Sequence, residues 1–423
     1  MKESYNKNLL NDVILGYVFR ILLMIISYMT IPLTLKYLGK SLYSEWVVVL
    51  SFIMWLGVSD LGISNSMRNY ITKSIESKDK QIQSGVNYSF SLMLVISLMI
   101  LLVINVYNYM SGLEYSFACF TLTLVLINLP FTISQAILLG SQNSPRQQRY
   151  QLYNGLIVIS GVYLFLLFDL DKNLLLMSIL YFLGIVSISY NSWRYILKNL
   201  KIELPKVINI KKERHRELEG NSFIFFIIQV SGLIVFSTDF YLMSLFFNSD
   251  AVTEYFLIDK LYSTFNIFIT ILLVPIWGYM AKAKENNNFL WIRQKLLLLI
   301  SLFFILSLFL YLISNYDFLI IEKWTGINDI KSFDKSDSIY FFVGSIFLAF
   351  NSLFTIVANG LNIIKIQAFL ILVGAMVKIP SILLMVNYFE FGAISIKIST
   401  IICLSLTVFI LPFFIFRNLI LEK

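Results

Sequence analysis

Apolar stretches long enough to cross a membrane recur along the whole of this chain. A sliding window finds twelve, at 13–33, 46–66, 85–107, 115–138, 150–168, 174–193, 221–243, 253–280, 296–314, 339–360, 367–388 and 393–416. A membrane-spanning helix needs about 20 such residues, whereas a barrel strand alternates polar and apolar residues over about 10. The sequence therefore predicts an all-α polytopic membrane protein with about 12 transmembrane helices. Only 14% of its 423 residues are charged, so no sizeable soluble domain is expected.

Basic residues are distributed unevenly between the connections. With a cytoplasmic N-terminus, the cytoplasmic segments carry 23 Lys and Arg and the opposite segments carry 6. Because basic residues collect in cytoplasmic loops, both termini are predicted to be cytoplasmic. The net charge of +8 then reflects membrane topology, and no nucleic-acid partner is expected.

The longest polar connection in the interior runs from 194 to 220, with eight basic and four acidic residues. It predicts an N-terminal six-helix lobe (1–200), a basic cytoplasmic linker (201–220) and a C-terminal six-helix lobe (221–423). Six spans in each half give both halves one orientation, as in transporters that rock two bundles. The linker is interpreted as a solvated loop or a surface-lying helix, or alternatively as a grip for anionic headgroups.

Eight charged residues fall inside the predicted spans, where an ionised group costs roughly 2.5–3.5 kcal/mol without a partner or a watery cavity. They are Arg20, Asp60, Asp239, Glu254, Asp259, Lys260, Lys378 and Lys397. Arg20 and Asp60 are predicted at similar depth on neighbouring helices. Lys378 is predicted near the middle of its span, two residues before Pro380, without an acid of the first half at its depth.

Two interpretations of these charges stay open. Opposite charges either pair to hold helices together, or the bases bind an anionic substrate while the acids bind a coupling ion. The substrate-binding candidates are Arg20, Lys378, Lys260, Lys397 and Trp55, a mid-span ring that offers either a lipid-facing filler or a stacking surface for a sugar. The ion-coupling candidates are Asp60, Asp239 and Asp259. Glu254, at a span edge, is expected to be an exposed interfacial carboxylate.

Residues for catalysis or metal binding are scarce. Cys119 and Cys403 lie in apolar runs, where cysteine behaves as a small hydrophobe, and the only histidine, His215, lies in a charged stretch. No catalytic residue, metal site or cofactor is therefore expected, and the chain is predicted to be no enzyme.

The first 80 residues carry a more specific pattern, formed by IPLTLKYLGKSLYSEWVVVLSF at 31–52 and WLGVSDLGISNSMRN at 55–69. This region resembles the N-terminal region of Wzx-type O-antigen flippases. They belong to the polysaccharide exporter branch of the multidrug/oligosaccharidyl-lipid/polysaccharide (MOP) superfamily. Elsewhere the resemblance extends only to twelve spans in a six-plus-six layout. It implies two six-helix lobes around a central cavity, in the bacterial inner membrane.

The resemblance also implies a function. It is the flipping, by alternating access, of an undecaprenyl-diphosphate-linked O-antigen repeat unit from the cytoplasmic to the periplasmic leaflet in lipopolysaccharide biosynthesis. Coupling to an H⁺ or Na⁺ gradient is implied, with membrane lipids, an O-antigen polymerase and a chain-length regulator as further partners. Arginine and lysine recognise phosphate, so Arg20 suits a diphosphate at the cytoplasmic entry and Lys378 suits a point charge at mid-depth.

Three alternatives are less consistent with the sequence. A drug/cation antiporter of the same fold favours an acidic cavity, but four in-span bases balance the four acids. An envelope polysaccharide polymerase needs a periplasmic platform, and the longest outer connection, 315–338, is short and acidic. A peptidoglycan-precursor flippase generally has fourteen spans. The O-antigen flippase is the preferred prediction.

Overall fold

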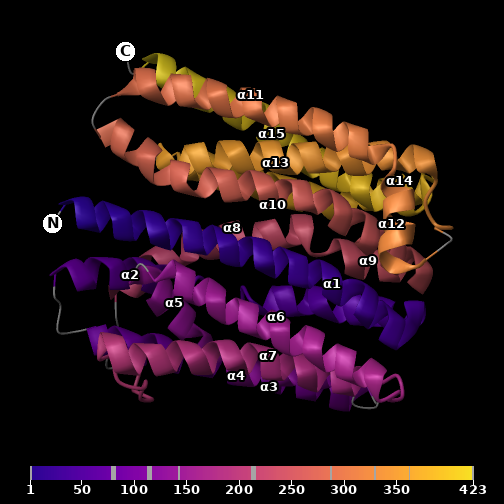
Figure 1. Cartoon of the computed structure of the whole chain (residues 1–423), viewed down its shortest axis with the longest axis horizontal. Helices are drawn as coiled ribbons and strands as arrows, with labels where there is room; N and C mark the ends of the chain where they lie inside the picture. Colours follow the sequence, from indigo (N-terminus) through magenta and orange to yellow (C-terminus); the bar gives the residue numbers. More distant parts are fainter. Residues whose placement is uncertain are drawn as a thin grey trace. The chain divides into compact units, whose positions relative to one another are not determined.

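The structure is a computed structural model that describes residues 2–421, except 78–81, 112–116, 142, 211–215, 286–287, 328–329 and 362. Every regular element in the described part is helical (Figure 1), which confirms the predicted all-α membrane class. The chain divides into two compact units, Met1–Phe226 and Ile227–Lys423. The boundary lies a few residues beyond the predicted linker.

Unit 1, Met1–Phe226, is a helical bundle in which α1 packs on α6, α7 packs on both α4 and α6, and α2 packs on α5. Pro130 interrupts the fourth apolar stretch, so that a 3-10 turn separates α4 from α5. The elements are α1 (Lys2–Leu56), α2 (Ile63–Ser77), α3 (Ile82–Ser111), α4 (Phe117–Asn128), η1 (Leu129–Thr132), α5 (Ile133–Gly140), α6 (Ser144–Leu167), α7 (Leu174–Tyr195) and a π-helical turn, η2 (Ile196–Leu200).

Unit 2, Ile227–Lys423, packs α13 against α10 and α15, and α14 against α15. A break between α8 and α9 places Asp239 in the first turn of α9. Helix α8 (Arg216–Phe236) crosses the boundary between the units. The elements that follow are α9 (Asp239–Phe246), α10 (Ser249–Glu285), α11 (Phe289–Ser314), α12 (Asp317–Thr325), η3 (Lys335–Asp337), α13 (Ser338–Gly360), α14 (Ile364–Asn387), η4 (Gly392–Ile394) and α15 (Ser395–Leu421).

Ten segments of the described chain are long and apolar enough to cross a membrane, against the twelve predicted. The first, Ile14–Leu56, has 43 residues, about twice the length of one crossing, and contains the first predicted span and most of the second. It is broken at Gly39, whose φ of 77° is accessible to glycine without steric cost. The predicted span 253–280 lies in α10, which is not among the ten.

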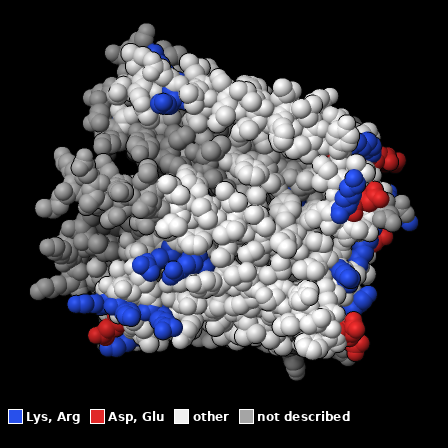
Figure 2. Space-filling model, viewed as in Figure 1, with Lys and Arg blue, Asp and Glu red and all other residues white. Residues whose placement is uncertain are grey.

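The surface has the pattern expected of a protein in a bilayer. Figure 2 shows charged side chains towards the ends of the helices and an almost uncharged area between them. Large apolar side chains are exposed on the surface of both units, including Leu102 on α3 and Phe304 on α11. In water such a surface would cause aggregation, whereas in a bilayer its apolar side chains contact the lipid tails without an energetic cost.

The start of the predicted linker is an irregular, largely exposed segment and not a helix. Residues 201–209 form an extended segment, here called the strap, which lies along α3. Its backbone N–H groups at Glu203, Lys206 and Ile208 donate to Gln83, Asn87 and Ser91 at 2.9, 3.0 and 2.9 Å. These acceptors are spaced four residues apart and so share one face of the helix. Of the predicted loop and the predicted surface-lying helix, the irregular strap fits the loop and not the helix, and polar side chains of α3 supply its backbone with hydrogen-bond partners; 211–215 lie outside the described residues.

The predicted orientation can be tested with reporters that are active only in the periplasm. We expect activity for fusions in the α6–α7 turn at Lys172 and after α12 at Gly326, because these connections are poor in basic residues. A fusion in the strap at Val207 should be inactive, with a cytoplasm-active reporter at the same position as its control. Periplasmic activity at Val207 would contradict the predicted topology.

Candidate functional site

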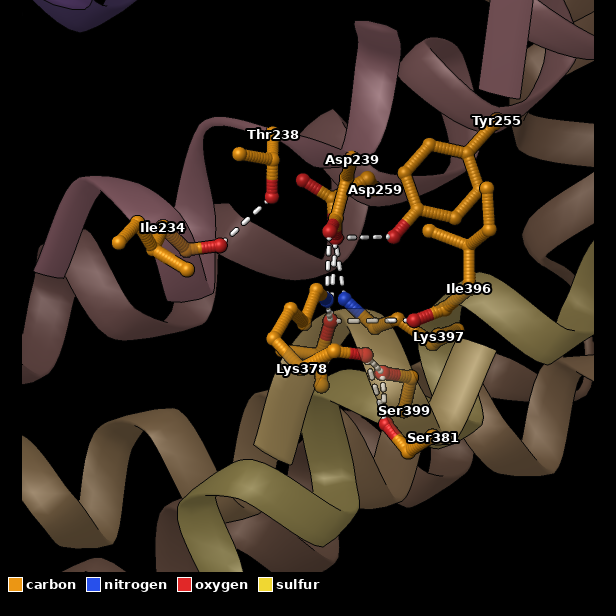
Figure 3. Close-up of polar contacts among 11 residues, drawn as sticks. Ile234, Thr238, Asp239, Tyr255, Asp259, Lys378, Ser381, Ile396, Lys397 and Ser399 are labelled. Carbon is orange, nitrogen blue, oxygen red and sulfur yellow. Dashed lines mark hydrogen bonds and ion pairs between the residues drawn. The ribbon is translucent and has the colours of Figure 1, made fainter. Parts of the chain in front are cut away.

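Two ion pairs lie inside unit 2, where α9, α10, α14 and α15 meet (Figure 3). The inner pair joins Lys378 on α14 to Asp239 on α9, and the outer pair joins Lys397 on α15 to Asp259 on α10. All four belong to the eight charged residues that the sequence predicts inside membrane spans. Within the apolar bundle of unit 2, hydroxyl groups hydrogen-bond to both members of the inner pair.

The inner pair is fully enclosed. Lys378 Nζ lies 2.6 Å from Asp239 Oδ1, and the lysine side chain has no exposed surface. The other carboxylate oxygen, Oδ2, accepts hydrogen bonds from the hydroxyls of Tyr255 at 2.7 Å and Thr400 at 3.1 Å. The Thr400 hydroxyl also accepts a hydrogen bond from Lys378 Nζ. Both oxygens of Asp239 are therefore occupied by protein groups from three other helices.

Local sequence explains how Asp239 reaches this position. Helix α8 ends at Phe236, and the Thr238 hydroxyl donates to the Ile234 carbonyl at 2.6 Å, as Figure 3 shows. Asp239 then begins α9, where the unpaired N–H groups of a helix N-terminus favour a carboxylate. The break between α8 and α9 thus puts the carboxylate at a helix N-terminus instead of inside a continuous helix.

The backbone carbonyl of Lys378 is hydrogen-bonded by side chains of α14 and α15. Helix α14 continues through Pro380, and the Lys378 carbonyl accepts hydrogen bonds from the hydroxyls of Ser381 at 2.8 Å and Ser399 at 3.0 Å. Side-chain hydroxyls therefore satisfy the backbone beside Pro380. The sequence predicted no acid of the first half at the depth of Lys378, and its partner, Asp239, indeed comes from α9 of the same half of the chain.

The outer pair is more open. Lys397 Nζ donates to Asp259 Oδ1 at 2.5 Å and lies 5.4 Å from the centre of the Phe341 ring, a cation–π contact. The Asp259 side chain is 27% exposed, and its second oxygen accepts no hydrogen bond from the described residues. Gly344 on α13 makes room for the lysine stem, because a Cβ there would lie 2.6 Å from Lys397 Cε. An entering ligand can thus reach this pair with less rearrangement than the inner one.

Arg20 and Asp60 are not brought together in unit 1. With its amide oxygen turned towards Arg20, the buried Gln148 accepts from Arg20 Nε at 2.8 Å and from a terminal guanidinium nitrogen at 3.1 Å. No carboxylate among the described residues pairs with Arg20. Its positive charge is therefore oriented by a neutral amide and is not neutralised.

Asp60 lies in a turn, not in a span. Helix α1 ends at Leu56, and Asp60 accepts hydrogen bonds from the backbone N–H groups of Gly62 at 2.9 Å and Ser64 at 3.0 Å at the start of α2. Burial raises the pKa of this carboxyl above its ordinary value, although these hydrogen bonds act in the opposite direction. The in-span placement was wrong because the turn-forming sequence GVSDLG at 57–62 was included in the apolar window.

The structure also gives the location and burial of the remaining candidates, Trp55, Glu254 and Lys260. Trp55 is partly buried in the last turn of α1 instead of at mid-span. Glu254 is fully buried, and its carboxylate accepts from the backbone N–H groups of Lys331 and Ser332 at 3.2 and 2.7 Å, so it ties the loop before α13 to α10. Lys260 follows Asp259 in α10 and is partly buried.

Sequence reasoning missed a third charged cluster. Asp317, at the start of α12, is fully buried, pairs with Lys335 and accepts a hydrogen bond from the Tyr262 hydroxyl at 2.7 Å. It also missed Tyr255 and Thr400 of the inner pair. Uncharged hydroxyl residues give no hydropathy signal, and Asp317 lay in a connection that appeared to be solvated.

The chain is similar to known membrane transporters. It is 21% identical over 333 residues to a Salmonella typhi protein named "Putative O-antigen transporter", covering 74% of this chain and 75% of that protein. It superposes with a TM-score of 0.72 and 13% identity on the inward-facing conformation of a multidrug resistance MATE family transporter of the MOP superfamily, over 97% of this chain and 99% of that one.

A MOP superfamily transporter from Pyrococcus furiosus, described as having a binding pocket of reverse polarity, superposes with a TM-score of 0.68 and 14% identity over 97% and 96% of the two chains. No family model matches the chain. The chain therefore has the fold of the MATE transporters of the MOP superfamily, and its sequence is distantly related to that of the Salmonella typhi protein.

Proposed function

We propose that this protein flips an undecaprenyl-diphosphate-linked O-antigen repeat unit from the cytoplasmic to the periplasmic leaflet of the bacterial inner membrane. The proposal depends on the sequence similarity to the Salmonella typhi protein, which extends along 74% of this chain and 75% of that one. The transporter fold supports it, since the cargo needs a polar path for its headgroup while its polyprenyl tail stays in lipid. Partners in this proposal are the lipid-linked oligosaccharide, an O-antigen polymerase and a chain-length regulator.

Lys397 is the cation of unit 2 that we assign to the headgroup. A diphosphate oxygen can replace the Asp259 carboxylate as the partner of Lys397, because both are anionic oxygens that accept charge-assisted hydrogen bonds. The Phe341 ring keeps the ammonium group in place during the exchange. Lys378 suits this role less well, because its partner, the Asp239 carboxylate, is buried and accepts hydrogen bonds from two hydroxyls.

Asp259 is the acid that we assign to ion coupling. When the headgroup occupies Lys397, the carboxylate loses its cation and takes up H⁺ or Na⁺ in exchange. Its second oxygen has no hydrogen-bond donor among the described residues, whereas both oxygens of Asp239 are occupied and Asp60 caps a helix. Headgroup binding and cation binding are thereby linked through one ion pair.

Arg20 is the cation of unit 1 that we assign to the diphosphate. Gln148 fixes the direction of the guanidinium group without cancelling its charge. A planar guanidinium can donate two parallel hydrogen bonds to phosphate, so a pre-oriented group loses little conformational freedom when it binds.

The function can be tested by complementing a strain that lacks its O-antigen flippase but makes the matching repeat unit. We expect surface O-antigen to return and cytoplasmic-face lipid-linked repeat units to fall. Purified protein in liposomes should also expose a fluorescent lipid-linked oligosaccharide to an external quencher. Failure of both assays, together with export of a cationic dye, would instead support a drug/cation antiporter.

Arg20 and Asp60 give a prediction that separates substrate binding from ion pairing. Arg20→Ala should reduce O-antigen display at least tenfold, whether alone or with Asp60→Asn, since a charge-assisted hydrogen bond is worth about 1.5–3 kcal/mol. Asp60→Asn alone should stay near normal, because asparagine also caps helices. Membrane abundance is measured for each variant by immunoblot. Restored display in the double variant would show that the two residues act as a pair.

A further inference from the structure

An apolar groove runs along the outside of unit 1, between α7 and the α4–η1 junction, and the strap closes one end. Its volume is about 320 Å³. Helix α7 contributes Phe182, Ser189 and Trp193, the α4–η1 junction contributes Asn128 and Phe131, and the strap contributes Leu204. No residue of the proposed transport site lines it.

The length of the groove matches one leaflet of a bilayer. Phe182 and Trp193 lie eleven residues apart on α7. At 1.5 Å per residue this is about 16 Å, close to half of the roughly 30 Å hydrocarbon thickness. A groove of that length accommodates one hydrocarbon chain from the headgroup level to the bilayer midplane.

Exposed basic residues gather at the strap end of the groove. Arg194 directly follows Trp193, and Lys198 and Lys201 lie between Trp193 and Leu204, followed by Lys206. Glu203 is the only acid in this stretch and pairs with Lys206 at 3.4 Å. Arg194, Lys198 and Lys201 therefore leave an excess of positive charge at the end of an apolar groove, which is complementary to an anionic amphiphile.

Two polar side chains in the groove have no protein partner among the described residues. Ser189 is 4% exposed, and its hydroxyl makes no hydrogen bond. Asn128 is also buried, and its side-chain amide makes none either. A buried hydroxyl without a partner costs about 1–3 kcal/mol, so an acceptor from a bound molecule would stabilise the groove.

We propose that the groove is a binding site for an anionic diacyl phospholipid, with one acyl chain along α7 and the phosphate at Arg194 and Lys201. The ester carbonyls of such a lipid lie between phosphate and chain, where they can accept hydrogen bonds from Ser189 and Asn128. A polyprenyl chain has no acceptor along its length and cannot satisfy these groups. The lipid holds the strap against α7 and so anchors the segment that leads to unit 2.

The full-length protein in nanodiscs provides the test, with native mass spectrometry counting the lipids retained after release. We expect phosphatidylglycerol to be retained at one tightly bound copy, and phosphatidylcholine at least tenfold less. Arg194→Gln with Lys201→Gln should lower phosphatidylglycerol retention about tenfold. Neutralising Lys172 and Lys323, which are also exposed, is the charge-matched control and should leave retention unchanged.

Two groove variants separate tail binding from surface charge. Val186→Trp fills the partly exposed groove wall and should abolish retention, with size-exclusion chromatography confirming a folded protein. Ser189→Ala should weaken retention severalfold yet raise the thermal stability of lipid-free protein, because it removes an unpartnered hydroxyl. Equal retention of both phospholipids, or retention of a polyprenyl phosphate in place of phosphatidylglycerol, would overturn the proposal.

Discussion

Lys378→Met is expected to destabilise unit 2 by about 3–5 kcal/mol, because it leaves the Asp239 carboxylate buried without its cation. For a unit of this size, the loss corresponds to a melting temperature lower by about 10 °C. The double variant Lys378→Met with Asp239→Asn should recover most of the loss, since asparagine still accepts from Tyr255 and Thr400. Thermal unfolding of the purified protein, followed by fluorescence, measures all three proteins.

The same variants decide whether Lys378 contacts the substrate. If Lys378 holds helices together, the double variant should regain O-antigen display along with stability. If the Lys378→Met protein has normal stability but transports nothing, Lys378 binds the substrate instead of holding helices together. A double variant as unstable as the single one would show that the two charges do not act as a pair.

Lys397→Met is expected to lower O-antigen display at least tenfold at nearly normal membrane abundance. The headgroup loses a charge-assisted hydrogen bond worth about 1.5–3 kcal/mol. Stability should fall less than for Lys378→Met, because the exposed edge of Asp259 can be hydrated once its lysine is gone. Lys397→Arg keeps the charge and should retain part of the transport.

A variant in which the two charges are exchanged is the control, because it keeps the ion pair but changes which helix carries the cation. Exchanging the two residues, as Lys397→Asp with Asp259→Lys, keeps a pair between α10 and α15 but moves the cation. If only pairing matters, the exchanged protein should transport normally. If the headgroup requires a cation on α15, as we propose, the exchanged protein should fold and still fail in the liposome flipping assay. Normal transport by Lys397→Met would refute the assignment.

The turn between α1 and α2 has a composition from which it can be predicted. Residues 57–62 contain two glycines, a serine and an aspartate, a composition typical of turns, and Leu61 and Gly62 both adopt positive φ. The hydropathy window averaged these residues with the apolar residues before them. Asp60 could therefore have been predicted as the cap of α2, and Trp55 as a residue near a helix end.

The all-helical class and most of the membrane-crossing segments could be predicted from the sequence alone. They depend on the local length of apolar runs, which each segment must provide to satisfy its own backbone in hydrocarbon. Which charges meet was decided by tertiary structure. Lys397 and Asp259 are 138 residues apart, and Thr400 and Asp239 are 161 apart. Sequence position estimates only depth along the membrane normal. The lateral placement of helices, which brings Lys378 to Asp239 and leaves Arg20 beside Gln148, arises only when the bundle packs.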